Sequence, residues 1–162
     1  MGFFDKIKAS MERQKEAAAR IKELQRAEEA SFKVNGLFYH MENVEAIGQP
    51  NPDYKKTKSA LIKEGKTEDK IYKTIYGIPM CELVREPDNE HDKNAIRVEV
   101  DHRLIGYISK RQNKALLKIM DEKKILTSDV MIVGGPYKMI GADGSSYSDK
   151  TDHWARVKIK YV

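Results

Sequence analysis

A short polar stretch concentrates the side chains that could do chemistry. Asp88, Glu90 and Asp92 alternate between positions 86 and 94, with His91 among them. Carboxylates at this spacing suggest a cation site, but a calcium loop also needs a glycine at its sharp turn and a closing glutamate. The stretch has neither at the required positions. We therefore expect no metal here and interpret residues 86–94 as a polar loop.

The sequence lacks the motifs of familiar catalytic chemistry. Residues 141–144 read Gly-Ala-Asp-Gly but lack the Gly-Lys-Ser/Thr ending of a phosphate loop, and no Gly-x-Ser-x-Gly elbow occurs. Cys81 stands in an apolar stretch with Met80 and Leu83, which favours a buried core residue over a reactive thiol. None of the four histidines has a Cys or His partner at metal-ligand spacing. We expect a protein that is not an enzyme and has no cofactor.

Positive charge is concentrated in two segments of the chain, whose formal net charge is +5. Residues 103–124 hold seven Lys or Arg against Asp121 and Glu122, and residues 154–162 add Arg156, Lys158 and Lys160 without an acid. Clustered positive charge can be the electrostatic footprint of a polyanion. The alternative is an ordinary solvated lysine-rich face.

The N-terminal part is expected to be one long helix over residues 3–30, rich in Ala, Glu, Lys, Arg and Gln. Its apolar residues approximate a seven-residue repeat: Phe4, Ile7, Met11, Ala18 and Ile21. Such a thin stripe suits an exposed extension or half of a weak coiled coil, and we expect self-association. The chain has no apolar run of membrane-spanning length and no signal-peptide core, so we expect a cytoplasmic protein that does not bind membranes.

The rest of the chain, residues 32–162, predicts one domain. Alternating apolar residues and turn signals indicate six strands: 32–41, 79–86, 95–101, 104–109, 129–140 and 153–161. Helices are expected over 51–65, from Thr67 through Ile75 and over 110–124, with a mobile loop over 141–152. The predicted fold class is mainly β with helices. It is a small OB-like or SH3-like, partly open barrel with an inserted helical pair at about 43–76 and an N-terminal helical extension, residues 1–31.

The most distinctive segment reads LVREPDNEHDKNAIRV over residues 83–98, followed by LIGYI over 104–108. It resembles the HIRAN family signature, in which Arg-Glu-Pro-x-Asn-x-x-Asp-x-Asn-Ala-Ile-x-Val precedes a hydrophobic-Gly-Tyr strand. The resemblance extends over roughly residues 32–140 and is nearest to standalone bacterial members of the Gram-positive type. It implies an OB-like barrel that grips the 3′ end of single-stranded DNA.

Six residues occupy the family's DNA-binding positions: Tyr39, Asn89, His91, Asp92, Tyr107 and Lys110. The resemblance implies that aromatic rings stack on terminal bases, that a loop carboxylate meets the 3′ hydroxyl and that a lysine meets phosphate. A carboxylate repels phosphate, so it would select an end over an internal position. Two positions depart from the pattern: His91 replaces a stacking aromatic residue, and Phe38 replaces a basic one.

Two interpretations of the chain remain open. In the first, it is a nucleic-acid-binding module for single-stranded DNA, especially 3′ ends. In the second, it is a protein–protein adaptor, with the N-terminal helix for assembly and the barrel for a partner. At residue level, Asn89, Asp92 and Asn94 could also simply hydrogen-bond the backbone of their own loop, as such residues do in turns.

Overall fold

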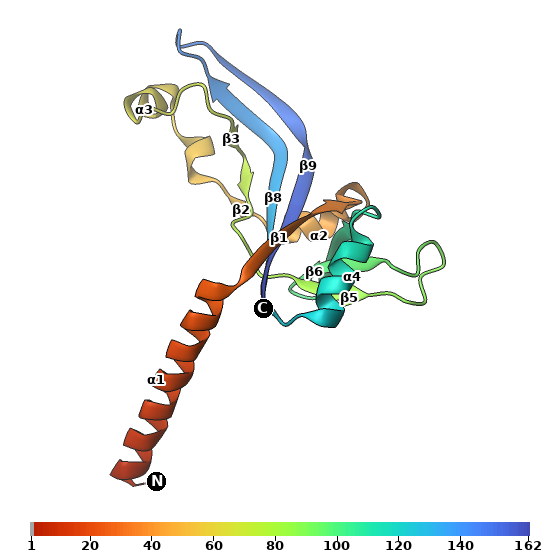
Figure 1. The fold of residues 1–162 in the computed structure, drawn as a ribbon. Coiled ribbons are helices and arrows are strands. Elements are labelled where there is room, and N and C mark those ends of the chain that lie inside the picture. Colours follow the sequence, from red (N-terminus) through yellow and green to blue (C-terminus); the bar gives the residue numbers. More distant parts are fainter. Residues whose placement is uncertain (1) are drawn as a thin grey trace.

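The computed structural model describes residues 2–162, and Figure 1 shows their fold. Within these residues a seven-stranded antiparallel sheet has the order β3-β8-β9-β1-β7-β6-β5. Its strands are β1 (Glu28–Asn35), β3 (Ile71–Tyr72), β5 (Glu82–Arg85), β6 (Ile96–Val100), β7 (Arg103–Ile108), β8 (Ile125–Ile140) and β9 (Ser146–Tyr161). The short strands β2 (Gln49–Pro50) and β4 (Thr74–Ile75) pair separately. The helices are α1 (Phe3–Arg26), α2 (Met41–Ile47), α3 (Lys58–Lys63) and α4 (Asn113–Glu122), with 3-10 turns η1 (Leu37–His40) and η2 (Pro52–Lys55).

The core lies on the concave side of the sheet, where alternate side chains of neighbouring strands meet. On β9, Ala155, Val157 and Ile159 are buried, whereas Trp154 and Arg156 face outward, as alternating side chains of one strand do. The other strands and α4 supply matching residues: Phe32, Val34, Ile96, Val98, Ile105, Leu116, Val130 and Ile132. Cys81 belongs to the same cluster, which confirms its prediction as a core residue.

The sheet curls far enough for its two sides to touch at one point. Met80 forms an isolated bridge with Asp129 of β8. Beside it, the Cys81 N–H donates to the Ser128 carbonyl (2.9 Å) and the Val130 N–H to the Pro79 carbonyl (3.0 Å). Because regular pairing does not continue beyond this contact, the sheet is a partly open barrel, and the predicted fold class is confirmed.

The β6–β7 hairpin confirms the prediction for residues 95–109. Asp101 and His102 adopt positive φ angles of 50° and 61°, which suit the tight turn of a hairpin. Glycine is required at position 106, because a Cβ atom there would lie 2.5 Å from the Asn35 carbonyl oxygen of β1. This close approach brings Asn35 opposite Tyr107 and joins the hairpin to β1.

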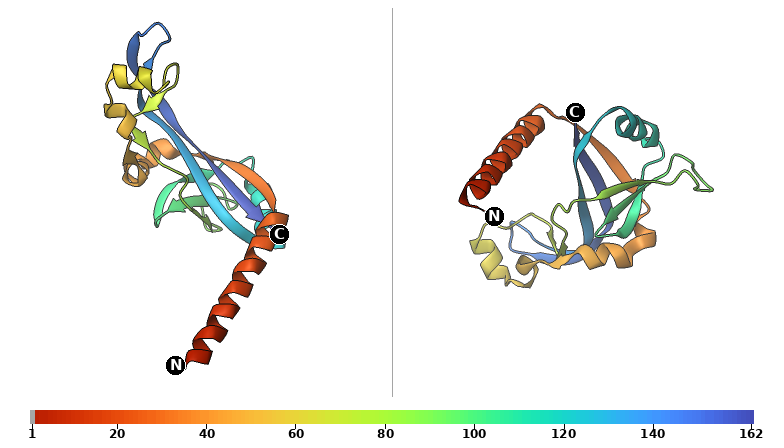
Figure 2. Two further views of the ribbon diagram at one scale, coloured as in Figure 1. Left: turned by 90° about the vertical axis from the view of Figure 1, so that its left-hand side faces the viewer. Right: turned by 90° about the horizontal axis from the view of Figure 1, so that it is seen from below.

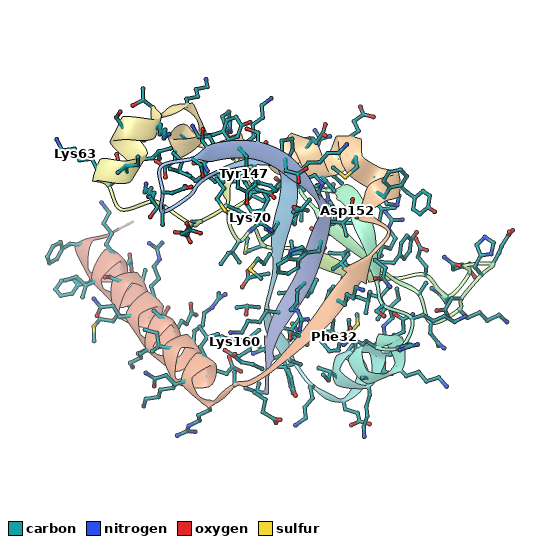
Figure 3. The ribbon with its side chains drawn as sticks, turned by 90° about the horizontal axis from the view of Figure 1, so that it is seen from above. Phe32, Lys63, Lys70, Tyr147, Asp152 and Lys160 are labelled. Carbon is teal, nitrogen blue, oxygen red and sulfur yellow. The ribbon has the colours of Figure 1, made fainter. Side chains whose placement is uncertain are left out.

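The predicted mobile loop over 141–152 is wrong, because β9 begins at Ser146 and pairs with β8 along its whole length. β8 and β9 extend beyond the barrel as a long curved hairpin, which Figure 2 shows in two views. Residues 146–150 are exposed, so this part of the strand carries no apolar alternation. In Figure 3, Tyr147 marks the distal part of the hairpin and Lys160 the end of β9 nearer α1.

Two boundaries near the N-terminus were predicted wrongly. The first helix ends at Arg26 rather than at residue 30, because residues from Glu28 onward pair with β9 in a register that sets Glu28 opposite Tyr161. The strand expected over 32–41 ends at Asn35, where Gly36 (φ 85°) turns the chain into η1 and α2. Tyr39 therefore lies on a 3-10 turn and not on a strand.

The insertion contains less helix than predicted. The helix expected over 51–65 is interrupted after η2, and the Thr57 side chain caps α3 by accepting from the Ala60 N–H (3.2 Å). The second expected helix, from Thr67 through Ile75, is wrong: β3 and β4 occupy its place. Ile71 pairs with Lys138 of β8 and buries its side chain with Leu61 and Ile140. Pairing with the long hairpin outweighs local propensity here.

α1 projects away from the barrel, and none of its residues is buried (Figure 1). Its base is tied to the barrel by an ion pair between Glu23 Oε1 and Lys124 Nζ (2.9 Å). α4 begins at Asn113, later than the predicted residue 110. No helix within residues 2–162 is long and apolar enough to cross a membrane.

Candidate nucleic-acid interface

The loop between β5 and β6 is shaped by its own side chains. The Asn89 Oδ1 atom accepts hydrogen bonds from the backbone N–H groups of His91 (2.9 Å) and Asp92 (3.0 Å). The Asp92 Oδ1 atom accepts from the Asn94 N–H (2.9 Å). The Ala95 N–H then donates to the Asp92 carbonyl (3.0 Å), which closes the loop. Asn89 and Asp92 therefore have the local structural role considered from the sequence, whatever else they contact.

The Glu86 carboxylate connects this loop to the β6–β7 hairpin. Its Oε2 atom accepts from Asn89 Nδ2 (2.8 Å), while Oε1 accepts from the Tyr107 hydroxyl (3.2 Å) and from Arg97 Nη1 (3.3 Å). Burial, together with the negative charge of Glu86, raises the pKa of Tyr107 above its ordinary value. The Tyr107 hydroxyl therefore stays protonated and committed to Glu86, so its ring is the part available to a ligand.

A second contact anchors the loop to α4. Asn113, the first residue of the helix, is 2% exposed and donates from Nδ2 to Asp92 Oδ2 (2.9 Å). Each Asp92 carboxylate oxygen thus accepts one hydrogen bond from the protein. A carboxylate oxygen has two lone pairs, so each keeps capacity for a further donor. Asp92 is only half-buried, which leaves that capacity accessible.

The structure joins Asn89, Asp92 and Tyr107 in one network through Glu86, but it leaves the other predicted residues at the surface. His91 and Lys110 are exposed, and within residues 2–162 neither side chain has a hydrogen-bond or ion-pair partner. Lys110 lies in the turn before α4 rather than at its first position. Tyr39 is 83% exposed on η1, and its neighbour His40 has its ring centroid 6.5 Å from that of Tyr107.

A groove that sequence reasoning missed begins at Tyr39. We call it the aromatic groove; it has a volume of about 650 Å³ and lies between the end of β1, η1 and the β8–β9 hairpin. Its lining includes three exposed aromatic rings, Phe38 (83%), Tyr39 (83%) and Trp154 (45%). Two exposed lysines, Lys33 and Lys150, also line it. The sequence offered one signal for this groove: the alternation over residues 153–161 sets Trp154 and Arg156 on the face of the strand opposite to the core residues.

The basic clusters are partly neutralised by acids elsewhere in the fold. Lys123 and Lys124 pair with Glu28 and Glu23, and Lys158 pairs with Glu29 (2.7 Å). Other basic side chains form no ion pair within residues 2–162: Lys33, Arg103, Lys110, Arg111, Lys114, Lys118, Lys150 and Arg156. Four of these cations lie on α4 or in the turn before it (Lys110, Arg111, Lys114 and Lys118), and Lys33 and Lys150 line the aromatic groove.

Two further kinds of chemistry, a reactive thiol and a metal site, depend on burial and on the grouping of possible ligands among the described residues. Burial raises the pKa of Cys81 to about 12, so this thiol stays protonated and is a poor nucleophile. Within residues 2–162, no three His, Cys, Asp or Glu side chains gather in a way that could hold a metal ion.

The part of the chain that the structure describes thus combines a small, partly open barrel with a polar loop fixed by its own hydrogen bonds and with unpaired surface cations. Residues 72–149 match the HIRAN domain, so this segment of the chain carries a HIRAN domain. HIRAN domains are generally nucleic-acid-binding modules rather than catalytic ones. The matched range includes Asn89, His91, Asp92, Tyr107 and Lys110, whereas Tyr39 lies before it.

A solved structure that is similar to the chain is the crystal structure of the HIRAN domain of human HLTF. The sequence identity is 18%, the TM-score is 0.39, and the likeness covers 82% of this chain and 74% of that chain. No curated protein sequence matches the chain.

Proposed function

We propose that this module binds single-stranded DNA at a free 3′ end. The observation that carries the proposal is the Asp92 carboxylate, which the Asn94 N–H and Asn113 Nδ2 hold in place while leaving lone pairs accessible. A terminal hydroxyl can donate to these oxygens. A phosphate at the same position would be repelled, so Asp92 favours a free end over an internal nucleotide or a 3′ phosphate.

The other predicted residues would supply base stacking, a phosphate contact and support for the loop. Tyr39 and His91 are exposed rings that can stack on bases, and Tyr107 offers its ring because its hydroxyl is bound to Glu86. Lys110 is an exposed cation that can contact phosphate. Asn89 has an indirect role, because its side-chain oxygen shapes the loop that presents His91 and Asp92.

The proposal is tested by fluorescence anisotropy with labelled oligonucleotides that differ only at the 3′ end. We expect tighter binding of a 3′-hydroxyl strand than of a 3′-phosphate strand, and weaker binding of both as salt rises. Equal binding of the two ends, or of duplex and single strand, would contradict end recognition. Absence of binding even at low salt would favour the protein–protein adaptor instead.

We further propose that α1 mediates self-association. Phe4, Ile7 and Met11 lie at helical spacing and are 83%, 41% and 55% exposed. An isolated helix with this stripe in water gains stability by burying it against a second copy, and the approximate heptad spacing suits a two-helix contact. Two linked modules could then engage two strand ends, or two sites on one strand, with increased avidity.

A further inference from the structure

We propose that the aromatic groove binds the nucleotides that precede the 3′ end. The proposed 3′-end site, made of His91, Asp92, Tyr107 and Lys110, is called the end pocket below. The strand would leave this pocket by way of Tyr39 and continue toward Trp154. This inference rests on the proposed function only in its ligand, single-stranded nucleic acid, and in the shared residue Tyr39. It assigns a separate contact surface to residues that lie outside the Asp92 loop.

The shape and surface chemistry of the groove suit a single strand. Phe38, Tyr39 and Trp154 expose large parts of their rings, although aromatic side chains gain stability from burial. Successive bases can stack on such rings without regard to sequence, because every base has a π face. A volume of about 650 Å³ is large enough for more than a terminal nucleotide's base. The buried Val34 and Leu37 form part of its apolar lining.

The charges around the groove are complementary to a phosphate backbone. Lys33 on β1 is directly opposite Arg156 on β9, and like charges in this position repel each other. Arg156 contacts only the Ser31 hydroxyl (3.4 Å), and within residues 2–162 neither cation has a carboxylate partner. Lys150 lines the groove on its hairpin side. A bound phosphate would relieve this repulsion, whereas Asp152 is the single acidic residue in the lining.

Two glycines let the strands of the β8–β9 hairpin approach each other closely beside the groove. Gly135 lines the groove with φ 93°, and a Cβ atom there would lie 3.1 Å from the His153 ring. Gly134 approaches the opposite strand even more closely, since its Cβ would lie 2.5 Å from the Asp152 carbonyl oxygen. The two glycines interrupt the β8–β9 register next to Trp154, which is where the strand would pass.

The chain contains a single tryptophan, so the wild-type protein reports on this groove directly. We would titrate the full-length protein with a thymidine dinucleotide and with an oligothymidine of about ten bases. The longer length lies within the range that single OB-fold domains bind. Excitation at the red edge of the indole band avoids tyrosine. We expect the longer strand to quench Trp154 fluorescence and to shield it from acrylamide, and we expect the dinucleotide to do neither.

Two variants and one matched control test the same assignment by anisotropy. Trp154→Ala should weaken binding of the longer strand by about 5- to 100-fold, and Lys150→Ala should reduce its salt slope by about 0.7. Both variants should keep the wild-type preference for a 3′ hydroxyl over a 3′ phosphate. Tyr147→Ala is the control, because Tyr147 is also an exposed aromatic residue of β9 (51%) but does not line the groove.

The outcomes separate the groove from the end pocket. If the longer strand binds with a 3′-hydroxyl preference but leaves Trp154 unquenched and unshielded, the groove assignment is wrong and the end pocket stands. If Trp154 is quenched but no end preference exists, the groove stands and the end pocket falls. If neither strand binds at low salt, both are wrong.

Discussion

Asn113 on α4 and Asp92 in the β5–β6 loop are joined by a hydrogen bond of 2.9 Å between Nδ2 and Oδ2. The Asn113 side chain is buried, and its Oδ1 atom has no hydrogen-bond partner within residues 2–162. Among residues 2–162, Asp92 is therefore the hydrogen-bond partner of the Asn113 side chain, and no second partner exists. The amide fixes a carboxylate that would otherwise depend on its own loop for orientation.

Asn113→Ala should weaken both stability and end recognition. Loss of a hydrogen bond to a charged group should lower the free energy of unfolding by about 1–2 kcal/mol, measured by urea denaturation. The freed Asp92 should also discriminate less between 3′-hydroxyl and 3′-phosphate strands in anisotropy titrations. Lys114→Ala is the matched control, since Lys114 is the exposed next residue. An Asn113→Ala protein with wild-type stability and discrimination would refute this role.

Tyr39→Ala should reduce affinity for single strands without affecting the fold. The ring is 83% exposed, so its removal costs little stability, but one stacking surface is lost. We expect binding to weaken by about 1–3 kcal/mol. Tyr39→Phe keeps the ring and should bind like wild type. If the alanine and phenylalanine variants bind equally well, stacking at this position does not contribute.

Lys110→Ala should weaken binding to every sequence alike. Removal of one phosphate contact should make the slope of log affinity against log salt shallower by about 0.7 for a single strand. Lys118→Ala provides the comparison, because Lys118 is also exposed and unpaired among residues 2–162 but lies farther along α4. Equal salt slopes for the Lys110 variant and wild type would remove Lys110 from the interface.

Ile7→Glu should abolish self-association of the full chain. The substitution places a charge in the middle of the exposed apolar stripe of α1, where burial against a second helix would be costly. Light scattering over a range of concentrations should give a larger mass for wild type than for the variant. Arg13→Gln, off the stripe, changes the net charge by the same amount and controls for the charge change. A wild-type mass equal to one chain at every concentration would contradict the proposal.

The strands that alternate between core and solvent could be predicted from the sequence. The β6–β7 hairpin and the inward face of β9 have one buried side, so their apolar residues recur at every second position. The distal part of β9 lacks this alternation of apolar residues, because residues 146–150 are exposed on both faces. β3 is also invisible in the sequence, since two residues become a strand only by pairing with Tyr137 and Lys138.

In the candidate site, too, the sequence predicted the grouping of residues that are neighbours in the chain but not of residues that only the fold brings together. Asn89, His91 and Asp92 stand in one motif, so their proximity is a local property of the sequence. The aromatic groove joins Phe38, Lys150 and Trp154, which come together only because β1 pairs with β9. Asn113 lay in a segment interpreted as a basic helix face. Its contact with Asp92 depends on how α4 packs against the loop.

The central claim is that the Asp92 carboxylate recognises a free 3′ hydroxyl. The most direct measurement compares wild type with Asp92→Asn in anisotropy titrations against 3′-hydroxyl and 3′-phosphate strands. Asparagine keeps an oxygen that can accept from Asn113 or from the Asn94 N–H, and urea denaturation verifies that the variant remains folded. We predict that wild type prefers the 3′-hydroxyl strand and that Asp92→Asn binds both strands alike, because the charge that repels a terminal phosphate is gone. A folded Asp92→Asn protein with the wild-type preference, or a wild-type protein without any preference, would contradict the account.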